Sequence, residues 1–79
     1  MTYEEFINTK TEMSRASYME LGGYAHEEER TLIVYDNHFY INKDGSDYHL
    51  IIERSEYTSK DISELEPILW EFAKHEINR

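Results

Sequence analysis

The chain has 79 residues, no cysteine, and 17 acidic against eight basic residues, for a formal net charge of −9. The length fits a single domain over residues 1–79, and the lack of thiols excludes disulfides and thiolate metal sites. Because nucleic acids and anionic membranes attract Lys and Arg, the negative charge disfavours direct binding to either. The sequence has no apolar segment typical of a signal peptide or a membrane span, so we expect a cytoplasmic protein.

The first predicted element is a helix over about residues 2–21. Thr2 and Glu5 have the spacing of a capping box, in which the Thr2 hydroxyl accepts from the Glu5 amide and the Glu5 side chain reaches back. Apolar residues then recur at intervals of three and four, although Lys10 and Ser17 interrupt the stripe. Gly22-Gly23 is expected to end the helix with a left-handed cap, and a connector follows up to the first strand.

Three strands are predicted over about residues 30–35, 38–43 and 46–54. Asp36-Asn37 and Asp44-Gly45 are expected to form the two turns between them, and Asp-Gly is the stronger signal because both residues tolerate positive φ. Counting outward from these turns places Tyr35 opposite His38, and Ile41 opposite Tyr48.

This register assigns every strand residue to a face, because directly opposed residues share a face and neighbours along a strand alternate. One face collects large apolar residues, namely Leu32, Val34, Phe39, Ile41, Tyr48, Leu50 and Ile52. The other face is mixed and holds Ile33, Tyr35, His38, Tyr40, Asn42, Asp47, His49, Ile51 and Glu53.

A second helix is predicted over about residues 63–78. The apolar stripe there is the strongest amphipathic pattern in the chain and consists of Ile62, Leu65, Ile68, Leu69, Phe72, Ala73 and Ile77. Asp61 and Ser63 compete as its N-cap, and we expect Ser63 because it brings Pro67 closer to the first turn, where proline is tolerated. The predicted fold is therefore α+β: a two-layer α-β-β-β-α arrangement, with a three-stranded antiparallel meander and both helices on its apolar face.

The mixed face is expected to stay open, and its aromatic and apolar content has three interpretations. Strand propensity alone favours Tyr and Ile even when exposed, whereas a homodimer or a foreign protein partner would bury them. The acidity likewise serves solubility alone or attracts a basic partner.

The leading prediction is a small acidic protein-binding module. Its sharper version is an inhibitor whose carboxylates occupy a basic, nucleic-acid-binding site of a target protein, in place of phosphates. The main alternative is a homodimeric structural or regulatory protein that uses the exposed Tyr/His face of the sheet and has no basic partner. The predicted partner-binding residues are Glu27, Glu28, Glu29, Tyr35, His38, Tyr40, Asp44, Asp47, His49, Ile51 and Glu53.

Motifs of catalysis and cofactor binding are missing from the sequence. It contains no Gly-rich phosphate loop, no G-x-S-x-G and no H-E-x-x-H, and a flat open sheet offers little concavity for an active site. We therefore expect no enzymatic activity, no cofactor and no metal. The diagonal pair His38 and His49 leaves a metal-binding regulator as a further alternative.

Overall fold

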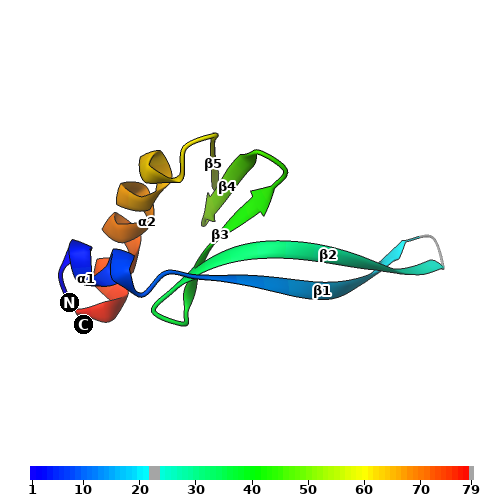
Figure 1. The fold of residues 1–79 in the computed structure, drawn as a ribbon, viewed down its shortest axis with the longest axis horizontal. Coiled ribbons are helices and arrows are strands. Elements are labelled where there is room, and N and C mark those ends of the chain that lie inside the picture. The colour runs from blue at the N-terminus through cyan, green and yellow to red at the C-terminus, as the bar shows by residue number, and fades with distance from the viewer. Residues whose placement is uncertain (22–23, 79) are drawn as a thin grey trace.

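The computed structural model describes residues 1–21 and 24–78, and the side chains of residues 1–14 and 30–78. Its elements are α1 (Tyr3–Asn8), β1 (Thr11–Leu21), β2 (Tyr24–Tyr35), β3 (Phe39–Asp44), β4 (Asp47–Ile52), β5 (Ser55–Ser59) and α2 (Ile62–Ile77). The described strands form one antiparallel sheet in the order β1-β2-β3-β4-β5 (Figure 1). The predicted α+β class is confirmed, but the sheet has five strands, not three. No helix among the described residues is long and apolar enough to cross a membrane.

α1 starts with the predicted capping box and ends after six residues. The Glu5 amide donates to the Thr2 hydroxyl at 3.2 Å, and the Thr2 amide donates to the Glu5 carboxylate at 3.0 Å. These hydrogen bonds lower the pKa of Glu5. At the other end, the Thr9 hydroxyl donates to the Phe6 carbonyl at 2.6 Å and accepts from the Asp36 amide at 2.8 Å. Thr9 thus closes α1 and fastens it to the turn between β2 and β3.

The prediction of a helix over residues 2–21 is wrong beyond α1. Residues 11–21 pair with β2 along their whole length, from Thr11 opposite Val34 to Leu21 opposite Tyr24. The predicted connector before residue 30 is therefore strand as well. Pairing with β2 provides hydrogen-bond partners for the backbone N–H and C=O groups of this segment. A helix here would have had only an interrupted apolar face to pack against the rest of the protein, and such packing supplies most of a helix's stability. The predicted cap at Gly22-Gly23 lies outside the described residues.

β1 and β2 form a long hairpin that extends far from the helices (Figure 1). β3 pairs with β2 only over residues 31–35, so residues 24–30 of β2 pair with β1 alone. We call residues 15–21 and 24–30 the arm, and the remaining described residues the body. The molecule is accordingly elongated, with extents of 45 × 27 × 24 Å.

The core of the body lies between the two helices and one face of the sheet. The Phe6 ring stacks on the Tyr35 ring with centroids 5.1 Å apart, and it lies at the same centroid distance from the half-buried Trp70. The fully buried cluster contains residues from both helices and three strands: Phe6, Ile33, Tyr35, Ile41, Leu50, Leu65, Leu69 and Ala73. From β3 and β4, Phe39, Tyr48 and Ile52 pack against it as predicted.

The two faces of β2 are the reverse of those predicted. Asp36 and Asn37 do adopt positive φ, and the His38 amide donates to the Tyr35 carbonyl at 3.2 Å. However, Tyr35 pairs with Phe39 instead of with His38, so the loop holds one additional residue.

A register shift of one residue inverts every side chain of a strand. Ile33 and Tyr35 therefore enter the core, while the predicted core residues Leu32 and Val34 are only half-buried and lie on the other face.

The turn between β3 and β4 is also displaced, but without a change of face. Asp44 opposes Asp47, so the turn residues are Gly45 and Ser46 instead of Asp44 and Gly45. Gly45 has a φ of 61°, and glycine at the first central position is typical of a type II′ turn. Tyr48 consequently opposes Lys43 instead of Ile41, a shift of two residues that preserves the faces.

The third predicted strand, over residues 46–54, divides into β4 and a turn that leads to β5. Glu53 adopts a φ of 54° in this turn, and Ser55 returns to pair with Ile52. β5 was not predicted, because its sequence SEYTS is short and polar. The strand lies at the edge of the sheet, where most of its residues are exposed.

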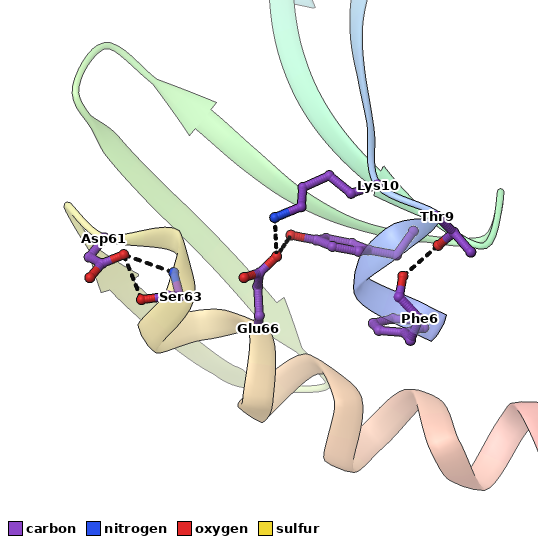
Figure 2. A network of polar contacts seen from close by, with 7 residues as sticks. Phe6, Thr9, Lys10, Asp61, Ser63 and Glu66 are labelled. Atoms are coloured by element: carbon purple, nitrogen blue, oxygen red, sulfur yellow. Dashed lines mark hydrogen bonds and ion pairs between the residues drawn. The ribbon is translucent and has the colours of Figure 1, made fainter. Parts of the chain in front are cut away.

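The N-cap of α2 is Asp61 and not the predicted Ser63, so it lies two residues earlier in the chain. The Ser63 amide and hydroxyl donate to the same Asp61 oxygen, at 3.0 and 2.7 Å (Figure 2). These two hydrogen bonds lower the pKa of Asp61. Pro67 consequently lies inside the helix, where its missing amide costs one hydrogen bond.

A buried carboxylate joins α2 to the residue that precedes β1 and to the last residue of β2. Glu66 is only 5% exposed, and its Oε2 accepts from Lys10 Nζ and from the Tyr35 hydroxyl, both at 2.7 Å (Figure 2). Burial and the hydrogen bond to Glu66 raise the pKa of Tyr35. Among the described residues, no buried side-chain nitrogen or oxygen lacks a partner. The cluster is therefore fully hydrogen-bonded, as buried polar groups that stabilise a core generally are.

Candidate protein-binding surface

β3 and β4 pair at the turn and then diverge. Their register runs from Asp44 opposite Asp47 to Asn42 opposite His49, although β3 begins three residues earlier and β4 continues to residue 52. The first half of β3 stays paired with β2, and the second half of β4 stays paired with β5. A cleft lies between the diverging halves.

The cleft is small and mostly apolar. It has a volume of about 140 Å³ and is lined by His38, Phe39, Tyr40, Leu50, Ile51, Ile52, Leu69 and Phe72. An apolar cavity of about 150 Å³ is large enough for benzene, whereas sites for drug-sized ligands occupy about 300–1,000 Å³. The dimensions fit one ring or one branched side chain, and they are too small for an organic cofactor.

Exposed apolar side chains gather around this cleft. Ile51 is 63% exposed, Tyr40 53% and Phe72 37%. Phe72 is held in place by an edge contact with Phe39, whose centroid is 6.4 Å away. Contiguous exposed apolar surface on a small protein is typical of interaction sites.

A second depression adjoins the cleft, because His38 and Phe39 border both. It has a volume of about 410 Å³, and its other lining residues are Asp36, Glu76 and Ile77. Two carboxylates thus stand beside apolar walls. Within the described part of the chain, neither Lys nor Arg lines either depression. We call the cleft and this depression together the groove.

The groove brings together three of the predicted partner-binding residues, namely His38, Tyr40 and Ile51. The prediction for Tyr35 is wrong, because its side chain is fully buried and its hydroxyl donates to Glu66. The cause is the additional loop residue described above, which turns this side chain into the core.

His49 does not line the groove but a third, more polar depression, which Arg30 and Glu56 also line and which borders the cleft at Ile51. Its Nδ1 is 3.3 Å from the Thr58 hydroxyl oxygen and 3.6 Å from a Glu56 carboxylate oxygen. The two histidines of the metal alternative therefore border different depressions. The described residues contain no group of three His, Cys, Asp or Glu side chains that could hold a metal ion.

The predicted carboxylates are dispersed over three places. Asp44 and Asp47 oppose each other at the end of the hairpin of β3 and β4, and Glu53 is exposed at the next turn. The third place is the arm, where the register sets Glu27, Glu28 and Glu29 opposite Tyr18, Ser17 and Ala16. No basic residue directly opposes these glutamates, and their side chains lie outside the described set.

Sequence reasoning missed Phe72, which it assigned to the apolar stripe of the second helix. The buried positions of α2 include Leu65, Leu69 and Ala73, which recur every four residues. Phe72 follows Leu65 by seven residues and Leu69 by three, which is the spacing of one helix face, so periodicity alone contained no signal of its exposure.

Comparisons with protein-family models, with curated proteins and with solved structures gave no match for this chain.

Proposed function

We propose that this chain is a small acidic module that binds another protein, and that its partner is basic. The observation that carries the proposal is the gathering of Tyr40, Ile51 and Phe72 around one cleft, in a chain whose net charge is −9. Protein interfaces commonly combine a desolvated apolar centre with a charged rim. The acidic surroundings select positively charged partners and accelerate their association.

The more specific form of the proposal is an inhibitor that occupies a nucleic-acid-binding site. Carboxylates would then accept charge-assisted hydrogen bonds from the Arg and Lys residues that otherwise hold phosphates. The opposed pair Asp44 and Asp47 supports this form, because like charges opposite each other in a sheet are unfavourable until a cation joins them. The three glutamates of the arm add further negative charge.

The test is affinity capture with the immobilised full chain, using an extract of the cells that produce it. We expect a basic protein that is retained at low ionic strength, released at about 0.5 M salt and displaced by duplex DNA. Retention that is indifferent to salt would contradict the charge-based proposal. Retention that responds to salt but not to DNA would contradict only the inhibitor form.

A homodimer is the second candidate function, and the uncovered outer edge of β1 favours it, because an unpaired strand edge can add another strand. Sedimentation velocity at micromolar concentration separates the two candidates. The proposal predicts a monomer. A stable dimer that a proline on the outer side of β1 dissociates would support a homodimer through this edge. One that Tyr40→Asp dissociates would support a homodimer through the exposed sheet face.

A further inference from the structure

We infer that the groove binds a partner segment in which one large apolar side chain stands beside a Lys or Arg residue. This inference rests on the proposed function and specifies the chemistry of the partner at one place.

The cleft determines the apolar part of the segment. Its volume of about 140 Å³ matches a single ring-sized group, and its rim residues Tyr40, Ile51 and Phe72 are substantially exposed. A Phe or Leu side chain entering the cleft would remove water from all three rim residues at once. Buried anchors of this kind, surrounded by weaker contacts, carry most of the binding energy in protein interfaces.

The adjoining depression determines the charged part of the segment. Asp36 and Glu76 line it, and it shares two walls with the cleft. A segment whose apolar residue fills the cleft therefore has its neighbouring residues next to Asp36, in a depression that Glu76 also lines. A Lys or Arg residue there would form charge-assisted hydrogen bonds, which are shorter and stronger than neutral ones.

The backbone of Asp36 is anchored at this site. Its backbone has a φ of 51°, and its amide donates to the Thr9 hydroxyl at 2.8 Å. α1 thus holds the turn in place before any partner arrives, which lowers the ordering cost of binding.

A second copy of this chain is a poorer occupant of the groove than a basic segment. Each copy carries a net charge of −9, so two copies repel each other at long range. The same field attracts a segment that contains Lys or Arg.

The experiment is selection from a random seven-residue peptide library over the immobilised full chain. We expect enriched peptides to combine one Phe, Leu, Ile or Trp with a Lys or Arg within two or three positions. A synthetic copy of the most enriched peptide is then titrated against the wild-type chain and its variants by fluorescence anisotropy.

The variants separate the two parts of the groove. Ile51→Asp should weaken peptide binding roughly tenfold or more, because it places a charge at the rim of the cleft. Asp36→Asn should weaken binding by a smaller factor, and only at low salt, because Asn tolerates the same left-handed backbone and removes only the charge. Tyr57→Asp is the matched control for Ile51→Asp. Tyr57 is likewise a large exposed apolar residue, but it does not line the groove.

The inference is overturned if no peptide is enriched, if enriched peptides lack either part, or if Ile51→Asp binds like the wild type. Circular dichroism must show that each variant is folded, and Tyr40→Ser replaces Ile51→Asp if it is not. If a basic protein is still captured by Ile51→Asp in a salt-dependent way, the groove assignment fails while the proposed function stands. If peptides bind the groove but the captured partner is not basic, the proposed function fails.

Discussion

The body and the arm belong to one sheet but are stabilised in different ways. In the body, both helices cover the sheet face that carries Ile33, Tyr35, Ile41 and Leu50, and the eight core residues are almost completely buried. The arm consists of two strands that pair only with each other. Because an isolated two-stranded hairpin is marginally stable in water, we expect the arm to depend on the body for its order and the body to depend little on the arm.

The largest effect is expected from Phe6→Ala in the body. Phe6 is fully buried and contacts Tyr35, Phe39 and Trp70, and large-to-small changes of this kind cost about 3–5 kcal/mol. Urea unfolding followed by circular dichroism measures the loss. The exposed Phe72→Ala is the matched control and should cost clearly less; equal losses would contradict the assigned core.

A smaller loss is expected from Tyr35→Phe, which removes one of the two donors to the buried Glu66 carboxylate. Leaving a buried charged group with fewer hydrogen bonds costs about 1–3 kcal/mol. The same unfolding measurement applies, with Tyr40→Phe as the control at an exposed site. A neutral Tyr35→Phe would mean that Lys10 alone satisfies the carboxylate.

The capping box of α1 should contribute less again. Thr2→Ala removes the acceptor for the Glu5 amide, and substitutions of this type cost about 1 kcal/mol. Ser55→Ala, at an exposed position of β5, is a suitable comparison. If Thr2→Ala leaves the urea midpoint unchanged, α1 is held by Phe6 and Thr9 and not by its cap.

The body should also lose stability in alkali. Burial and Glu66 raise the pKa of Tyr35 in the folded chain, so the folded state favours the neutral phenol. Its contribution is complete below the ordinary tyrosine pKa of about 10 and declines as the pH rises above that value. Melting temperatures recorded from neutral to alkaline pH should fall more steeply for the wild type than for Tyr35→Phe; parallel curves would contradict this assignment.

The smallest effect on stability is expected from shortening the arm. Arg15 and Arg30 oppose each other, so residues 16–29 can be replaced by a Gly-Ser turn that joins them. The free energy of unfolding should change by less than about 1 kcal/mol, because the removed strands are marginal by themselves. A larger loss would show that the arm stabilises the body. Amide exchange supplies a second measurement, since the arm should exchange faster than β3 and β4.

The sequence was informative where local chemistry decides the structure. The Thr2 and Glu5 capping box formed as predicted, and the alternation within β3 and β4 placed Phe39 and Leu50 on the helix side. The same alternation left Tyr40 and Ile51 exposed, which is why part of the groove was found in advance.

The sequence was misleading where the secondary structure depends on a distant segment, or where the side-chain orientation of a strand depends on one loop residue. β1 is a strand because β2 lies beside it, and its weak helical stripe contains no sign of that partner. Gly-Gly is also a hairpin dipeptide, and a hairpin turn at residues 22 and 23 would have given the pairing of Leu21 with Tyr24 that occurs. His38 belongs to the loop and not to β3, which exchanges the two faces of β2 relative to the prediction. Tyr35 was therefore assigned to the wrong face. The groove itself depends on where β3 and β4 diverge, which no local pattern encodes.

The uncovered outer edge of β1 also bears on how the protein behaves in acid. At neutral pH, mutual repulsion between copies opposes strand-to-strand stacking along this edge. As the pH approaches the isoelectric point of about 4.7, the net charge and that repulsion disappear while the edge remains available. Acidified samples should therefore form ordered β-aggregates, and a proline introduced on the outer side of β1 should delay them.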